Sequence, residues 1–388
     1  MNFEIVLQIF SGGFSGGKPV SYEAVEKKLS SVLPRLPVSK VIMGWATNKL
    51  PYEKTAEFLA KKNIDFYLWL PVFSESGKLK TQTPIMDFRG RQPENVSGHG
   101  DEDFSFCCPN NPGNVENVLA IFEEEFSAIP FTGVFLDKIR YPSFAQGGQG
   151  NVFSCFCPHC QVKYGRENFS PLEFINALDN PFPGPLGIRS YSGNGKYEFE
   201  DPVIARFFSL KAAFITHSLR RICGYFREKG YCVGLDVFAP FLSSFVGQDL
   251  TALSALSDFI KPMMYRLTNA PAGLPFEMEA LQRETVGKET LKRQRFFDLL
   301  GFNPGEKVFD LTFTVKELQN MAASTACPVY AGLEINRKEN LAEVYPDYVE
   351  ETVKAYAGAG IRGLVLSWDL LEAPEENITR VVDVVNRL

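Results

Sequence analysis

The sequence predicts a single large α/β domain, a (β/α)8 barrel of the TIM type with long inserts. Two observations carry this prediction. Eight short β-rich runs alternate along the chain with amphipathic segments of helical period. The eight runs are apolar almost throughout, as is typical of parallel strands that are buried on both faces. A doubly wound open sheet, which shares this alternation, is the alternative fold.

The expected elements follow one another in regular order. The strands are expected at 4–10, 40–46, 64–72, 133–141, 231–239, 259–266, 328–336 and 361–371. The helices are expected at 21–35, 52–62, 114–127, 203–229, 248–257, 275–300, 315–325, 345–358 and 374–387. Inserts rich in Gly, Pro, Asn and Ser follow the third and fourth strands, at 73–112 and 142–202. We expect one domain over 1–388, in which these inserts form loops or a small zinc-clamped subdomain at the C-terminal face of the barrel.

Composition and charge limit the class of partner. The net charge is −6 and the Lys and Arg residues are scattered, which argues against nucleic acid and anionic membranes as partners. Residues 3–10 are typical of a strand rather than of a signal peptide, and no apolar run reaches the ~20 residues of a membrane span. We therefore expect a soluble cytoplasmic protein, whose oligomeric state the sequence leaves open.

Three acidic residues near strand ends are the candidate catalytic groups, because barrel chemistry sits where the strands end. Strand alternation puts Asp137, Asp236 and Glu334 on faces that can converge at the barrel mouth. Two carboxylates that share one proton can perform acid/base or nucleophilic work on a glycosidic bond. Each acid taken alone also fits a structural ion pair or a helix cap.

Further candidate residues at the same strand ends would bind substrate. Aromatic rings there can stack on sugar rings, and a basic or acidic neighbour can bind hydroxyl groups, although two or three of the aromatic side chains can equally belong to the core. The candidates are Trp45, Trp69, Arg140, Tyr265, Trp368 and Asp369.

A cysteine cluster follows the fourth strand. Cys155, Cys157 and Cys160 form a C-x-C-x2-C pattern, and in a reducing compartment such clustering favours metal over disulfide. Tetrahedral zinc needs a fourth ligand, for which Cys108 is expected, with Cys107 and His159 as alternatives. A site closed by four thiolates would hold the loop rather than catalyse, and four reduced cysteines without a metal are the alternative.

Two segments carry a family resemblance. CCPNNPGNVENVLAIFEEEF and CFCPHCQVKYG are similar to the corresponding segments of the zinc-containing β-galactosidases of glycoside hydrolase family 42. The resemblance implies that Cys108, Cys155, Cys157 and Cys160 bind a structural zinc ion. That family places an Asn-Glu pair at the end of strand 4 and a nucleophilic glutamate on strand 7. Here strand 4 ends instead with Leu136 and Asp137.

The strands carry a second resemblance, which spans about 240 residues. GVFLDKIRYP, GLDVFAP, IKPMMYR and RGLVLSWDLL resemble strands 4, 5, 6 and 8 of uncharacterised glycoside-hydrolase-like barrels. This resemblance implies a sugar-active barrel with Asp137 and Asp236 at its site. Lys261 stands where the resembling strand has Ser, and we expect it to be paired, with Asp236 or Asp258, or to lie at the solvated strand start.

The sequence therefore predicts a glycoside hydrolase acting on an oligo- or polysaccharide. Asp137 would be the acid/base, Glu334 or Asp236 its partner, and Arg140 would orient Asp137 or a sugar hydroxyl group. One alternative is a Schiff-base lyase or aldolase that uses Lys261, which comes early in its strand for that role. The other is a barrel that binds glycans or a protein partner without catalysis, which the absent Asn-Glu pair favours.

Overall fold

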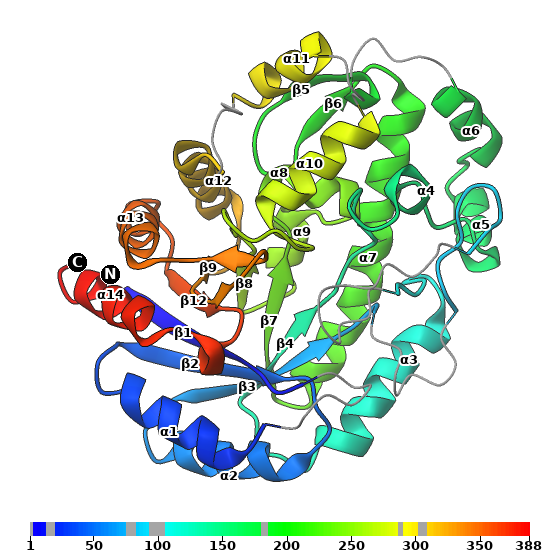
Figure 1. Ribbon diagram of the computed structural model, residues 1–388. Coiled ribbons are helices and arrows are strands. Elements are labelled where there is room, and N and C mark those ends of the chain that lie inside the picture. Colours follow the sequence, from blue (N-terminus) through cyan, green and yellow to red (C-terminus); the bar gives the residue numbers. More distant parts are fainter. Residues whose placement is uncertain are drawn as a thin grey trace.

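The computed structural model forms a barrel of eight parallel strands surrounded by helices (Figure 1). It describes residues 3–12, 20–74, 83–92, 105–179, 185–285, 290–301 and 309–388. The strand order is β8-β7-β4-β3-β2-β1-β12-β9. Parallel bridges join β8 to β9 at Ile260 with Val329 and at Met263 with Gly332, which bring the two ends of the sheet together. The barrel is thus confirmed, and the open-sheet alternative is wrong.

All eight expected strands are present. They are β1 (Glu4–Phe10), β2 (Val38–Gly44), β3 (Asp65–Pro71), β4 (Gly133–Asp137), β7 (Cys232–Val237), β8 (Phe259–Pro262), β9 (Tyr330–Glu334) and β12 (Gly363–Ser367). Most of their apolar side chains are buried, because helices cover the outside and other strands face them across the barrel. Several strands end two to four residues earlier than expected, so that Arg140 and Tyr265 lie in the loops that follow β4 and β8.

Helices connect the strands in the order that the sequence predicts. They include α1 (Tyr22–Val32), α2 (Lys49–Ala60), α3 (Pro112–Ile121) with η1 (Phe122–Phe126), α7 (Pro202–Glu228), α8 (Pro240–Ser243), η3 (Ser244–Val246), α9 (Leu250–Ser254), α12 (Leu311–Ser324), α13 (Pro346–Ala357), η4 (Leu370–Glu372) and α14 (Glu375–Val385). The helix expected at 275–300 corresponds to α10 (Leu274–Thr285) and α11 (Thr290–Leu300), and the residues between them, 286–289, lie outside the described residues. Side-chain caps start several helices, as when Asp201 accepts a hydrogen bond from the backbone N–H of Val203.

The two inserts lie beyond the ends of β3 and β4. The first pairs with itself at Ser74 with Phe106 and Pro84 with Cys107, while 75–82 and 93–104 lie outside the described residues. The second contains α4 (Gly148–Val152), α5 (Pro158–Arg166), α6 (Pro171–Asp179), η2 (Pro185–Gly187) and a hairpin of β5 (Ile188–Tyr191) and β6 (Tyr197–Phe199). Residues 180–184 are again outside the description. Figure 1 shows α4, α6 and the hairpin on the side toward which β4 and β7 point, which is the C-terminal side of the barrel.

Aromatic stacking attaches the second insert to the barrel. Phe174 of α6 stacks on Phe207 of α7 with ring centroids 4.1 Å apart, and Phe156 stacks on the same ring at 5.8 Å. The insert is therefore anchored by its own apolar cluster, which positions the cysteine-bearing loop next to the barrel mouth.

No helix in the described part of the chain is long and apolar enough to cross a membrane.

Candidate active site and cysteine centre

A cavity of about 350 Å³ opens at the C-terminal ends of the barrel strands. Clefts of this size, lined by apolar rings and a few polar groups, are typical of small-molecule sites. All three tryptophans of the chain line it. The cavity brings together eight of the nine predicted catalytic and substrate-binding residues: Trp45, Trp69, Asp137, Arg140, Asp236, Tyr265, Trp368 and Asp369.

Asp137 is held at the last position of β4 by two donors. The indole Nε1 of Trp69 donates to Asp137 Oδ2 at 2.9 Å, and the backbone N–H of Lys138 donates to Oδ1. Lys138 adopts a left-handed conformation with φ of 51°, which turns the chain away directly after the acid. The carboxyl group is thereby oriented at the cavity wall, with both oxygens in defined positions.

Asp236 lies on the neighbouring strand β7 and is paired with a lysine. Its Oδ2 lies 2.9 Å from Nζ of Lys261, the residue opposite it in the β7–β8 register. Burial raises the pKa of Asp236 to about 7; the Lys261 ammonium opposes this rise, and the nearby charge of Asp137 adds to it. Asp236 thus retains a proton for part of the time near neutral pH.

Glu334, the third predicted carboxylate, is placed differently. Its side chain is fully buried and accepts hydrogen bonds from the backbone N–H groups of Leu267 and Thr268 and from the hydroxyl groups of Thr268 and Tyr348. Glu334 is absent from the cavity lining in the described structure. Burial raises its pKa, which these four hydrogen bonds oppose. In this geometry the carboxylate ties the loop after β8 to β9 and α13.

Two of the three tryptophans form an aromatic wall with Phe10. The rings of Trp45 and Trp69 meet edge to face with centroids 5.1 Å apart, and Phe10 packs against both. Nζ of Lys138 lies 4.4 Å from the Trp45 ring centroid, a cation–π contact. These rings combine a flat apolar surface with a fixed positive charge beside Asp137.

The end of β12, the strand next to β1, supplies another part of the lining. The side-chain oxygen of Asn336 accepts hydrogen bonds from the backbone N–H groups of Trp368 and Asp369, so that this turn is fixed by β9. Asp369 accepts from the backbone of Phe10 and Leu371, and burial raises its pKa to about 6. Arg140, in contrast, donates to the backbone oxygen of Tyr141 and to Gln146 and stacks on Phe238, which fixes the loop after β4.

Sequence reasoning missed several residues that line the cavity, most notably Gln8 and Phe10 of β1. Gln8 is completely buried in the apolar run EIVLQIF. A glutamine in the middle of a buried barrel strand is itself a signal, because an amide there needs polar partners inside the barrel.

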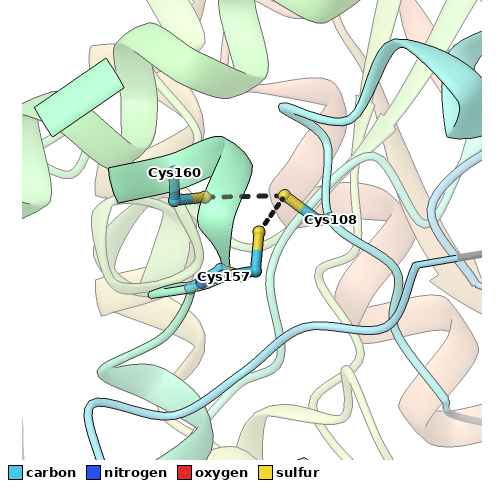
Figure 2. A group of neighbouring side chains, drawn as sticks. Cys108, Cys157 and Cys160 are labelled. Carbon is cyan, nitrogen blue, oxygen red and sulfur yellow. Dashed lines mark hydrogen bonds between the residues drawn. The ribbon is translucent and has the colours of Figure 1, made fainter. Parts of the chain in front are cut away.

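The cysteine cluster forms as expected from two separate segments. Cys108, Cys155, Cys157 and Cys160 are all buried, and their sulfur atoms lie within 4.8 Å of one another. Figure 2 shows Cys108 facing Cys157 and Cys160, with Sγ–Sγ distances of 3.4 and 3.5 Å. A tetrahedral ion with metal–sulfur bonds of ~2.3 Å sets sulfur atoms about 3.8 Å apart, so the four sulfurs are spaced for such an ion.

The surroundings of the sulfur atoms also fit a metal. The backbone N–H of Met86 donates to Cys155 Sγ at 3.3 Å, and the side-chain amide of Asn110 donates to Cys160 Sγ at 3.2 Å. His159, one alternative ligand, is exposed, and Cys107 lies outside the cluster, so Cys108 is the fourth member. The described cluster could hold a metal ion.

Comparison with known proteins places the fold. No protein-family model matches the sequence, and no curated protein matches it. The structure is similar to the PgaB (BpsB) glycoside hydrolase domain from Bordetella bronchiseptica, with a TM-score of 0.61, 15% identity, and 99% of each chain covered. It is also similar to the alpha-L-fucosidase isoenzyme 2 from Paenibacillus thiaminolyticus, with a TM-score of 0.54, 13% identity, and 100% of this chain covered against 49% of that one. The chain spans about half the length of the fucosidase. The protein therefore has the fold of the glycoside-hydrolase-like (β/α)8 barrels.

Proposed function

We propose that the protein is a glycoside hydrolase that acts on an oligo- or polysaccharide through Asp137 and Asp236. The observation that carries this proposal is that these two carboxyl groups line one cavity together with all three tryptophans. Rings of this kind stack on sugars, and a pair of carboxyl groups is what glycosidic cleavage requires.

The roles within the pair follow from their surroundings. Asp137, oriented by Trp69 and Lys138, is the acid/base that meets the glycosidic oxygen, and Asp236 is its partner. Burial raises the pKa of Asp236 to about 7, so this partner can hold and release a proton near neutral pH, as an acid/base pair requires. A carboxyl separation of about 5 Å would predict retention at the anomeric carbon, and about 6.5–9.5 Å inversion.

The Schiff-base alternative has weaker support. A Schiff-base lysine attacks as the neutral amine, which requires a lowered pKa. Burial alone would lower the pKa of Lys261, but Asp236 and Tyr265 outweigh this effect and raise it. Lys261 Nζ is also engaged by three hydrogen-bond acceptors.

The test is hydrolysis of a panel of aryl glycosides by the wild-type protein, Asp137→Asn and Asp236→Asn. Glu334→Gln is the matched control, because it alters a buried carboxyl group outside the cavity. Loss of turnover in the first two variants and retention in the control is the expected pattern. Turnover that survives in Asp137→Asn would overturn the proposal. Glycan binding without turnover by both wild type and Asp137→Asn would favour the non-catalytic barrel.

For the cysteine cluster we propose a structural zinc ion bound by Cys108, Cys155, Cys157 and Cys160. Four thiolate ligands leave no open coordination position, so the ion would clamp the loop between β4 and α5 rather than react. Sites with four sulfur ligands suit zinc or iron, and the two differ in colour and in elemental analysis. A red protein with one iron per chain would contradict zinc. We also propose a cytoplasmic location, where cysteines stay reduced and can bind a metal.

A further inference from the structure

Lys261 occupies the interior of the barrel beneath the cavity. Its side chain is completely buried on β8, and its Nζ lies 2.9 Å from Asp236 Oδ2, 2.7 Å from the Tyr265 hydroxyl oxygen and 3.2 Å from Gln8 Oε1. A lysine ammonium group has three N–H donors and no acceptor, so these contacts use all of them. Gly332 of β9 has no side chain and so makes space for Lys261, because a Cβ there would lie 2.9 Å from Lys261 Cε.

These contacts dictate how Gln8 presents its amide. Because the ammonium group can only donate, it must face the amide oxygen of Gln8, and the Ser367 hydroxyl group donates to the same oxygen at 2.9 Å. The NH2 group is therefore turned the other way. Nε2 of Gln8 is buried and has no hydrogen-bond partner among the described residues.

Only one of the two carboxyl oxygens of Asp236 has a hydrogen-bond partner among the described residues. Lys261 engages Oδ2, while Oδ1 is buried without a hydrogen-bond partner in the described structure. Gln8 and Asp236 both line the cavity. A donor and an acceptor, each anchored to one lysine nitrogen, thus stand unpaired at the cavity floor, an arrangement that is unfavourable unless a ligand completes it.

We propose that Lys261 is a positioning residue that orients Gln8 and Asp236 so that the cavity floor takes a hydroxyl group of a neutral sugar ring. This inference rests on the proposed sugar-binding function. A hydroxyl group can donate to Asp236 and accept from Gln8 at once. A sugar carboxylate in the same place has no proton to donate to Asp236, and an ammonium group would leave the Gln8 donor unpaired.

The experiment measures binding in the Asp137→Asn background, where turnover does not interfere. The probes are the methyl glycosides of glucose, galactose and mannose and the methyl glycosides of the matching uronic acids, titrated by calorimetry or by saturation-transfer NMR. We expect saturable binding of at least one neutral glycoside and at least about tenfold weaker binding of its uronic acid counterpart.

Two variants, one at Lys261 and one at the neighbouring Gly332, test the positioning role of the lysine. Lys261→Met keeps the aliphatic stem and removes the donors, and Gly332→Ala keeps the charge but crowds Cε. Each is expected to weaken binding of the neutral glycoside by about tenfold or more. Lys211→Met is the control, because Lys211 is equally buried but donates to the backbone oxygens of Val152 and Phe245 and is not part of the described cavity lining. It should lower the melting temperature and leave the affinity unchanged.

A second readout separates positioning from mere stability. Removal of the ammonium group removes an influence that opposes the effect of burial on Asp236, so its carboxyl resonance should titrate at higher pH in Lys261→Met. If Lys261→Met does not fold, Gly332→Ala decides the question. Unchanged affinity in a folded lysine-site variant, preference for the uronic acid, or no saturable binding of any neutral glycoside would each overturn the inference. If the wild-type protein binds glycosides without hydrolysing them, the proposed catalysis is wrong, but the inference about hydroxyl binding stands.

Discussion

The barrel mouth and the cysteine cluster both include residues that follow β4. They differ in whether their buried polar atoms have hydrogen-bond partners. At the mouth, Gln8 Nε2, Trp45 Nε1 and Asp236 Oδ1 are buried without hydrogen-bond partners among the described residues. In the cluster, the sulfur atoms contact one another and receive N–H donors from Met86 and Asn110. Polar atoms of the described mouth thus lack partners, whereas the four sulfur atoms are spaced for an ion. The difference agrees with the reactive site and the separate structural clamp that we propose.

The Asp137→Asn variant tests whether the barrel mouth and the cysteine cluster act independently. It is the change for which we expect the largest effect on turnover. General acid/base catalysis contributes roughly 10²–10⁴-fold, so the turnover number on an aryl glycoside should fall by about that factor. Metal content should stay at the wild-type value, because the substitution retains shape and lies outside the cluster. The melting temperature should fall modestly, because an asparagine offers one acceptor oxygen to the two donors that Asp137 now binds. Equal loss of metal and activity would show that the two regions are not independent.

The Cys157→Ser variant tests the cysteine cluster by removing one proposed metal ligand. A hydroxyl group is a poor substitute for a thiolate ligand, so bound metal should be lost and the loop between β4 and α5 should become sensitive to protease. We expect a smaller effect on activity, because Cys157 and the described residues around it do not line the cavity. Metal analysis, limited proteolysis and kinetics on the same preparation provide the check. Full metal occupancy in Cys157→Ser would contradict the four-thiolate site.

The pH dependence of stability reports the buried carboxyl group at the mouth. The pKa of Asp236 is raised by burial from 3.8 to about 7, so the folded protein binds a proton that the unfolded chain has released between these values. The free energy of unfolding should therefore fall as pH rises from about 4 to about 7, by roughly 1 kcal/mol per unit from this group. Denaturant unfolding of wild type and Asp236→Asn across this range tests it. If the unfolding free energy changes with pH by the same amount in both proteins, another group, for instance Asp369, causes the dependence.

Glu334→Gln should have the smallest effect on chemistry and a moderate effect on stability. Its four hydrogen-bond donors need two acceptor oxygens, and a glutamine supplies only one. We expect the free energy of unfolding to decrease by about 1–3 kcal/mol, while the turnover number changes by only a few-fold. A loss of turnover comparable to that of Asp137→Asn, with unchanged stability, would return Glu334 to the catalytic pair.

Much of the site could be predicted from the sequence because barrel strands end at one face. Asp137, Asp236 and the three tryptophans stand near strand ends, and the closed sheet brings those ends to one cavity. The four cysteines could also be predicted, since a C-x-C-x2-C pattern is local and only Cys108 had to be supplied from another segment.

Other features were decided by tertiary structure alone. Glu334 shares the period of its strand with inward-facing residues, but three donors from the loop after β8 and the Tyr348 hydroxyl group of α13 hold it outside the cavity lining. The pairing of Lys261 was expected, whereas its contact with Gln8 joins residues 253 positions apart. The physical reason is that strand alternation, charge and cysteine spacing are properties of short segments. Which donor meets which acceptor inside a barrel depends on closure of the whole sheet.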